Sequence, residues 1–247
     1  MIEIRITALM RSGSHPIIDW MVNQLPGKTT YINDILHPDC KDYHNIKLCD
    51  EHADFLVYNL EDRFLRAGER EANRVIYDHS FRKDMKRILI IRDPYNMFAS
   101  RYARETSRTN PITGEFQHPE ISKCRWTPLK GWTSPAAIRC WKDHATEAIR
   151  PTFVDVVIKY NNWFSDAEYR KQIAEELGLN FTDKGINKIN LVGEGSSFDG
   201  VKYQDNASKM NVLHRYKRYL YDTYFVSLFD EEIKNMTQKI FNWTPEL

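Results

Sequence analysis

The feature that most constrains this chain is a short polar turn between a predicted strand and a predicted helix near its start. The stretch from Ile2 to Leu9 is rich in apolar residues, which predicts a buried strand. The turn Met10-Arg11-Ser12-Gly13-Ser14-His15 follows at once. Pro16 comes next and suits the first turn of a helix, where its missing N–H is no loss. We expect that helix to end at Pro26-Gly27.

A strand, a Ser/Gly turn and a helix N-terminus in this order predict a site for an anion. Backbone N–H groups of the turn and the positive end of the helix dipole point toward the same place. The turn adds side-chain donors from Arg11, Ser12, Ser14 and His15. We therefore expect the ligand to be a phosphate or sulfate ester.

The same arrangement occurs a second time, further along the chain. Four consecutive apolar residues, Ile88 to Ile91, predict a central parallel strand that is buried on both faces. Arg92, Asp93 and Pro94 follow, and these are suitable residues to cap and open a helix. A second strand–turn–helix unit is therefore expected here.

The whole pattern predicts an α/β fold with three layers, α/β/α, around a central parallel sheet, in one domain over 1–247. Residues 28–50 lack periodicity and are predicted to be loop, and 104–135 to be an inserted loop on the acceptor side. Further strands are predicted at 53–58, 75–77 and 153–159, and further helices at 60–72, 136–150, 166–177, 207–220 and 222–241.

Composition excludes several classes of protein. The chain has 35 basic and 34 acidic residues, which argues against a general nucleic-acid binder. No apolar stretch has the length of a transmembrane segment, and the start lacks a leader pattern, so we expect a cytoplasmic protein. The cysteines form no CxxC pair, which predicts free thiols and no metal site. They are Cys40, Cys49, Cys124 and Cys140.

The two turns together resemble the sulfotransferase superfamily, whose members use 3'-phosphoadenosine 5'-phosphosulfate, PAPS. Its first motif reads Lys/Arg-Ser-Gly-Thr/Ser, similar to Arg11-Ser12-Gly13-Ser14. Its second reads Arg-x-Pro with a serine eight positions after the arginine, similar to Arg92-Asp93-Pro94 with Ser100. His15 stands where many members have Thr or Ser. The resemblance implies a P-loop NTPase-like sulfotransferase fold and, as function, sulfuryl transfer to a hydroxyl or amine.

The resemblance also implies roles for these residues. Ser12 to His15 and the backbone at Gly13 would hold the 5'-phosphate, and Arg92 and Ser100 the 3'-phosphate. Arg11 is our candidate for the catalytic cation, because charge develops on the 5'-phosphate as it leaves. The implied donor is PAPS, the product is adenosine 3',5'-bisphosphate, and no metal is required.

The general base has several candidates. Many cytosolic members carry Lys-Thr-His before the second motif, and this chain has Tyr77-Asp78-His79 there. The resemblance therefore implies His79, since an imidazole with a pKa of about 6.5 suits proton transfer near neutrality. Some branches use a carboxylate from an earlier segment, which leaves Glu51, His52 and Glu61 as rivals.

The acceptor and the flanking loops are less determined. The loop Gly193–Gly200, with Arg215 and Lys217 nearby, either closes over the nucleotide or is an ordinary surface loop. The expected acceptor is a small molecule or a glycan. Three tryptophans, Trp126, Trp132 and Trp141, either line its pocket or belong to a local core.

Two other functions remain open on sequence grounds. A P-loop kinase or hydrolase shares the first unit, and Asp93 at a strand end suits Mg²⁺. However, no Gly-x4-Gly-Lys-Ser/Thr motif is present to support that alternative. A non-catalytic relative that binds a nucleotide or a partner protein also fits, because the Lys and Thr before His79 are missing.

Overall fold

A computed structural model describes residues 2–36, 53–76, 84–107, 133–189, 196 and 198–246. Its centre is one sheet with strand order β2-β3-β1-β4-β5, in which every neighbouring pair is parallel. The strands are β1 (Ile2–Ala8), β2 (Thr29–Ile32), β3 (Phe55–Glu61), β4 (Asp84–Ile91) and β5 (Val156–Lys159).

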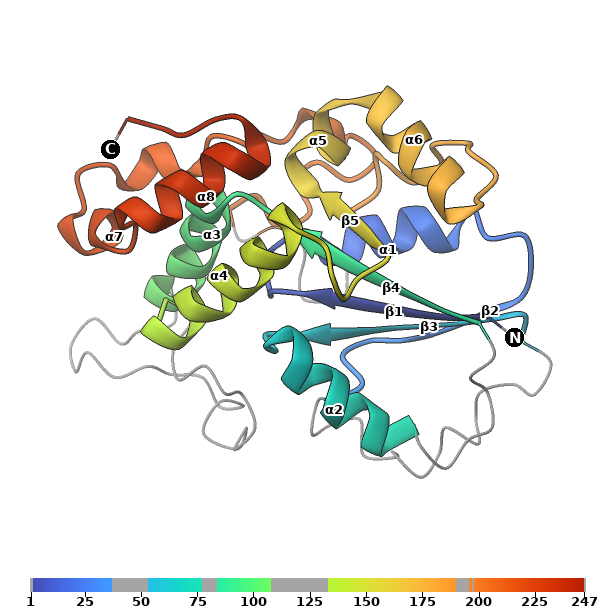
Figure 1. Ribbon diagram of the computed structural model, residues 1–247. Coiled ribbons are helices and arrows are strands. Elements are labelled where there is room, and N and C mark those ends of the chain that lie inside the picture. Colours follow the sequence, from blue (N-terminus) through green and yellow to red (C-terminus); the bar gives the residue numbers. More distant parts are fainter. Residues whose placement is uncertain are drawn as a thin grey trace.

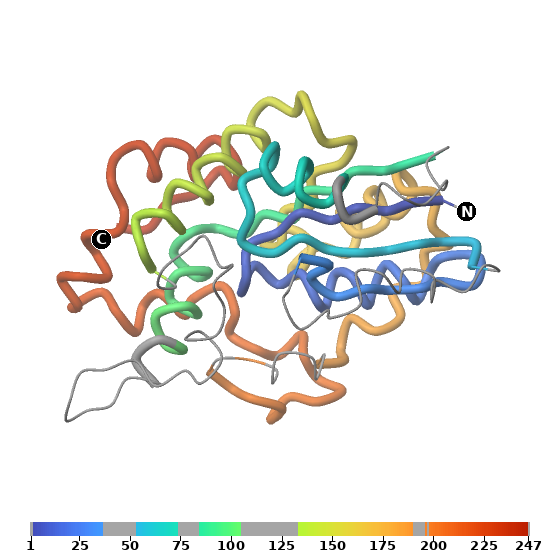
Figure 2. The backbone as a smooth tube through the Cα atoms, turned by 90° about the horizontal axis from the view of Figure 1, so that it is seen from below, coloured from blue at the N-terminus to red at the C-terminus, as the bar shows by residue number. Residues whose placement is uncertain are grey.

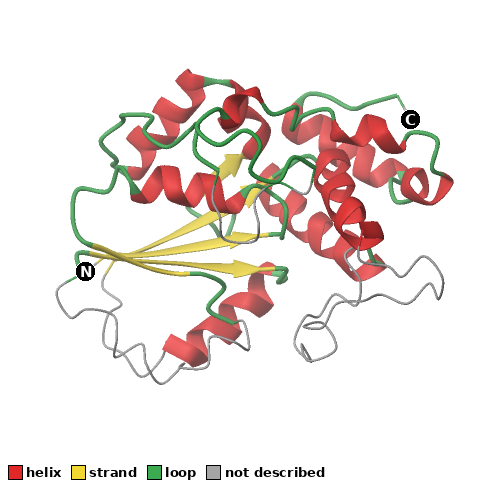
Figure 3. Ribbon diagram, turned by 180° about the vertical axis from the view of Figure 1, so that it is seen from behind, coloured by secondary structure: helices red, strands yellow, loops and turns green. Residues whose placement is uncertain are grey.

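Helices cover both faces of the sheet (Figures 1 and 3). One face carries α1 (Ser14–Val22), α5 (Tyr160–Ser165) and α6 (Ala167–Leu177), and the other carries α2 (Leu65–Ile76) and α4 (Pro135–Ile149). The predicted α/β fold with a central parallel sheet is thus confirmed. Within the described ranges, no helix is long and apolar enough to cross a membrane.

The remaining helices lie beyond the carboxyl ends of the strands (Figure 1). They are α3 (Pro94–Ser107), α7 (Thr223–Ser227), α8 (Glu231–Phe241) and the short 3-10 helices η2 (Ala207–Lys209) and η3 (Arg215–Tyr219). The chain that follows α6 returns to α3 (Figure 2), and η3 packs against that helix. This return brings η3, from the C-terminal part of the chain, to the edge of the sheet where β1 and β4 end.

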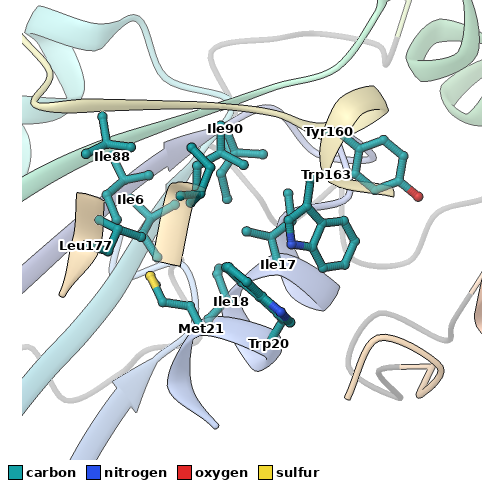
Figure 4. Close-up of a cluster of buried hydrophobic side chains, with 14 of the residues drawn as sticks. Ile6, Ile17, Ile18, Trp20, Met21, Ile88, Ile90, Tyr160, Trp163 and Leu177 are labelled. Carbon is teal, nitrogen blue, oxygen red and sulfur yellow. The ribbon is translucent and has the colours of Figure 1, made fainter. Parts of the chain in front are cut away.

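Strand β1 is buried on both faces, but with different chemistry on each. Ile4 and Ile6 join the apolar core, whereas Glu3 and Arg5 are buried on the opposite face. Figure 4 shows the apolar side, where α1 packs onto the sheet. Its labelled side chains include Ile17, Ile18, Trp20 and Met21 of α1, Ile6 of β1, Ile88 and Ile90 of β4, and Leu177 of α6. This packing fixes the start of α1, and with it the turn after β1.

Several element predictions are wrong in part. The expected loop 28–50 contains β2, an edge strand of four residues that is too short to leave a periodic signal. Val75 and Ile76, predicted as strand, are the last residues of α2, because Ala72 and this apolar pair follow helical rather than alternating spacing. The stretch 207–220 contains two short 3-10 helices instead of one helix.

The second C-terminal stretch, 222–241, is also divided, into α7 and α8. Each half has its own N-cap: Asp222 accepts from the N–H of Phe225, and Asp230 accepts from the N–H of Ile233. Aspartate favours this position because it satisfies N–H groups that have no partner inside the helix. Two capping aspartates in one predicted helix were therefore a sign of two helices.

Candidate anion-binding site

The turn between β1 and α1 is tight and partly left-handed. Ser12 N–H donates to Leu9 O at 3.0 Å, and both Arg11 and Gly13 have positive φ, 68° and 83°. A Cβ at position 13 would lie only 2.1 Å from a ring carbon of Tyr160. Glycine is required here both by the backbone conformation and by the closeness of the ring.

An ion pair holds the outer side of this turn. Met10 N–H donates to Asp62 Oδ1 at 3.0 Å, and Arg101 Nε donates to Met10 O at 3.0 Å. Arg101 is also paired with Asp62, and both side chains are almost fully buried. These contacts fix the turn against β3 and α3, so the role of Arg101 is structural.

Arg92 connects the two predicted turns directly. Its Nη1 donates to Arg11 O at 3.1 Å, and its Nη2 donates to Val212 O at 2.5 Å. The guanidinium carbon lies 4.7 Å from the centre of the Tyr160 ring. The turns after β1 and β4 are therefore adjacent, and Arg92 supports the first of them. Its Nε is buried without a hydrogen-bond partner.

Ser100 lies on α3 and meets an arginine that sequence analysis treated only as a nearby cation. Arg215 Nη1 donates to Ser100 Oγ at 3.3 Å. The same guanidinium donates through Nη2 to Ser196 Oγ at 2.6 Å and to Asp199 Oδ2 at 3.0 Å, and it stacks on Phe198. Arg215 thus links η3, α3 and the described residues of the 193–200 loop.

Guanidinium groups repel one another at this edge of the sheet. Burial and the charges of Arg104, Arg215 and Arg92 together lower the pKa of Arg11 to about 10, while Glu61 opposes them. Burial and Arg92 likewise lower the pKa of Arg215 to about 10, despite Asp199. We call Arg11, Arg92, Arg104 and Arg215 the arginine cluster. A bound anion would relieve this repulsion.

The hydroxyl of Ser14 and the ring of His15 already have polar partners at the carboxyl ends of β2 and β3. Ser14 Oγ donates to Glu61 Oε1 at 3.1 Å. His15 Nε2 lies 2.9 Å from Asn33 Oδ1 and 3.9 Å from Glu61 Oε1. Ser12 Oγ, in contrast, is buried and has no hydrogen-bond partner. In this structure Ser12, rather than Ser14, has a hydroxyl to offer to a ligand.

Asp93 is not arranged to hold a metal ion. It is fully buried, and its carboxylate accepts from Asn96 N at 2.8 Å, from Asn96 Nδ2 and from Asn161 Nδ2 at 2.9 Å. Its role is to cap α3 and to tie that helix to α5. Among the described residues, no group of His, Cys, Asp or Glu has the arrangement of a metal site.

Several predicted site residues lie outside the described residues: His79, Glu51, His52, Trp126, Trp132, and residues 193–195 and 197 of the 193–200 loop. Trp141 is described, and it belongs to the core, where its Nε1 donates to Arg92 O at 3.0 Å. Lys217 is exposed on η3.

Sequence analysis did not single out Arg104. It follows Ser100 by four positions on α3, so helical spacing places both on one face, and this was the available signal. Asp34, near Glu61, was also missed. It lies in a segment without periodicity, and only the fold brings it close.

Comparison with known proteins assigns no family to the chain. No family model and no curated protein matches the sequence. Among solved structures, the chain is similar to the mouse sulfotransferase SULT7A1 complexed with PAP, with 14% identity and a TM-score of 0.47. The match covers 97% of this chain and 83% of that chain. Residue roles in this chain come from its own geometry.

Proposed function

We propose that this protein transfers a sulfuryl group from PAPS to a hydroxyl or amine. The observation that carries the proposal is the arginine cluster, which gathers four guanidinium groups beside a tight turn and a helix N-terminus and in which neighbouring arginines help to lower the pKa of Arg11 and Arg215. Such an arrangement favours a ligand with several negative charges. PAPS has them at both ends of its ribose.

The turn after β1 fits the 5' end of this substrate. The N–H groups at the start of α1 and the buried Ser12 Oγ supply donors for a tetrahedral anion. In the reaction the acceptor atom attacks sulfur, the bond from sulfur to the 5'-phosphate oxygen breaks, and the phosphate keeps the electron pair. Arg11 stabilises that developing charge, which is the main contribution a protein can make to such a transfer.

The second anionic group fits between α3 and η3. Ser100 and Arg215 are already within hydrogen-bond distance of each other, and Arg215 Nε is buried without a partner. In this proposal they bind the 3'-phosphate, because guanidinium groups bind phosphate oxygens in pairs. Arg92 adds charge and holds the turn, since two of its nitrogens are bonded to backbone carbonyls.

The experiment is a thermal-shift titration in the absence of Mg²⁺. Adenosine 3',5'-bisphosphate is expected to stabilise the protein, by about 2.7 kcal/mol at a concentration of 100 times its Kd. Adenosine 5'-monophosphate, which lacks the 3'-phosphate, is the matched control and should stabilise it much less. Stabilisation by ATP with Mg²⁺ but not by the bisphosphate would favour a kinase, and no stabilisation by any nucleotide would contradict the proposal.

Transfer itself is tested with PAPS labelled in its sulfate and a panel of phenols, sugars and amines. A labelled product that needs the protein supports transfer. Binding of the bisphosphate without release of labelled sulfate to any acceptor, water included, would instead indicate a protein that binds the nucleotide without catalysis.

A further inference from the structure

Two carboxylates lie together at the carboxyl ends of β2 and β3, beside the turn that starts α1. Glu61 N–H donates to Asp34 Oδ1 at 3.3 Å, and Asp34 N–H donates to Asn59 Oδ1 at 2.7 Å. Asp34 has a φ of 39°, in the left-handed region that residues other than glycine adopt only when their surroundings hold them there. The fold thus places Asp34 firmly against β3.

Glu61 connects this pair to the anion-binding site. Its Oε1 accepts from Ser14 Oγ at 3.1 Å and from Asn59 Nδ2 at 3.3 Å. Glu61 also counteracts the charges that lower the pKa of Arg11. The hydrogen bond between Glu61 and Ser14 therefore connects the carboxylate pair to the turn where the sulfuryl group would be held.

The surroundings of Asp34 favour its protonated form. Burial and the charges of Glu61 and Asp62 together raise the pKa of Asp34 to about 7, although Arg63 and the hydrogen bond from the Glu61 N–H oppose this rise. Among the described residues, two further titratable groups lie beside this pair: Tyr31 of β2, whose pKa burial and Glu61 raise, and His15 of α1. A carboxyl group in this setting exchanges its proton near neutral pH, which suits a general base.

We infer that Asp34 accepts the proton that the acceptor releases, with Glu61 as its positioning residue. The inference rests on the proposed function. As the acceptor oxygen or nitrogen forms its bond to sulfur, its bond to hydrogen breaks and the proton moves to the Asp34 carboxylate. The electron pair of the broken sulfur–oxygen bond stays on the 5'-phosphate, so charge and atoms balance.

Asp34 suits this role better than Glu61. The Glu61 side chain is buried and its Oε1 already accepts hydrogen bonds from Ser14 and Asn59. The Asp34 carboxylate accepts the Glu61 N–H, and its side chain is partly exposed, which gives a substrate access to it. The charge of Glu61 helps this role because it raises the pKa of Asp34 toward the pH at which the acceptor reacts.

Carbon NMR of the labelled aspartate carboxyl groups tests the proton site without any acceptor. The Asp34 signal, assigned by its loss in Asp34→Asn, is expected to titrate near pH 7, and in Glu61→Gln its midpoint should fall by a measurable amount. A midpoint near 4, the value of an ordinary aspartate, would overturn the inference. Equal midpoints in the wild type and Glu61→Gln would remove the role of Glu61.

The rate of sulfate release from labelled PAPS, with water as acceptor, tests the catalytic part. The wild-type rate should fall as the pH is lowered below 7. The rate of Asp34→Asn should be about 10²- to 10⁴-fold lower and should no longer depend on pH in this range. Its affinity for adenosine 3',5'-bisphosphate should stay within about threefold, which is below the cost of a lost charged hydrogen bond. Glu175→Gln, on the exposed side of α6, is the matched carboxylate control and should leave rate and affinity unchanged.

The outcomes separate the two proposals. Asp34→Asn could bind the bisphosphate and keep the wild-type rate, or keep the fall in rate below pH 7. In either case the proton goes to another group, and the inference is wrong while the proposed function stands. If the wild type neither binds the bisphosphate nor turns over PAPS, the proposed function is wrong, and the catalytic role of Asp34 is wrong with it.

Discussion

Arg5 and Arg11 lie at opposite ends of the same short segment, and their surroundings are opposite in kind. Arg5, within β1, donates to Tyr58 Oη at 2.5 Å, to Glu3 Oε1 at 3.0 Å, to Asn73 and to Glu69. Burial would lower the pKa of Arg5, but Tyr58 and Glu69 outweigh burial and raise it. Arg11, six residues later, has its pKa lowered to about 10 by burial and by other arginines.

The difference separates a structural arginine from arginines that suit a ligand. At Arg5 the fold supplies the negative charge, so the charged side chain is satisfied before anything binds. At the arginine cluster, burial and like charges outweigh the nearby carboxylates Glu61 and Asp199, which costs stability and is retained when a ligand uses it. In our proposal the carboxyl-end edge of the sheet therefore binds the ligand, whereas the buried network around Arg5 stabilises the fold.

The largest effect is expected for Arg5→Gln. Removing the cation leaves Glu3 and Glu69 without their main partner, and breaking a buried pair in this way costs about 3–5 kcal/mol. Urea unfolding measures this cost. Arg87→Gln is the matched control: Arg87 pairs with the same Glu69 but is partly exposed, so about 1 kcal/mol or less is expected. Equal losses for both variants would remove the distinction.

Arg11→Gln should have the reverse profile. Loss of one charge relieves repulsion in the arginine cluster, so the unfolding free energy is expected to stay level or rise. Affinity for adenosine 3',5'-bisphosphate should fall about 10- to 100-fold, the usual value of a charge-assisted hydrogen bond. Calorimetry measures the affinity. A variant that unfolds as easily as Arg5→Gln and binds normally would reverse our assignment of the two residues.

Asp34→Asn extends the comparison from the arginines to a partly buried carboxyl group, through the pH dependence of the unfolding free energy. The folded pKa of about 7 lies above that of an unfolded aspartate, so the folded state holds a proton that the unfolded chain has lost between about pH 4 and 7. Wild-type stability therefore falls as the pH rises through this window. The variant lacks the effect, so it should gain on the order of 1 kcal/mol relative to wild type between pH 5 and pH 8. A constant difference across that range contradicts the raised pKa.

The smallest effect is expected for Ser100→Ala. One neutral hydroxyl contributes about 0.5–1.5 kcal/mol, so affinity for the bisphosphate should fall about two- to tenfold. Affinity for adenosine 5'-monophosphate should not change, because Ser100 is assigned to the 3'-phosphate. An equal loss for both nucleotides would place Ser100 elsewhere in the site.

The sequence predicts the positions of the two turns better than it predicts the contacts and charges of their side chains. Glycine at position 13 and the apolar run before Arg92 are local signals, and they locate both turns and their contact. The function of Arg92 as a support is not a local property, because it depends on the carbonyls of Arg11 and Val212, far apart in the chain. The proximity of Asp34 to Glu61 likewise depends on the pairing of β2 with β3.

The most direct measurement is a crystal structure of the protein with adenosine 3',5'-bisphosphate. We predict one phosphate on the N–H groups of residues 13–15, next to Arg11, and the other within hydrogen-bond distance of Ser100 and Arg215. A nucleotide bound with both phosphates away from the arginine cluster would contradict the account.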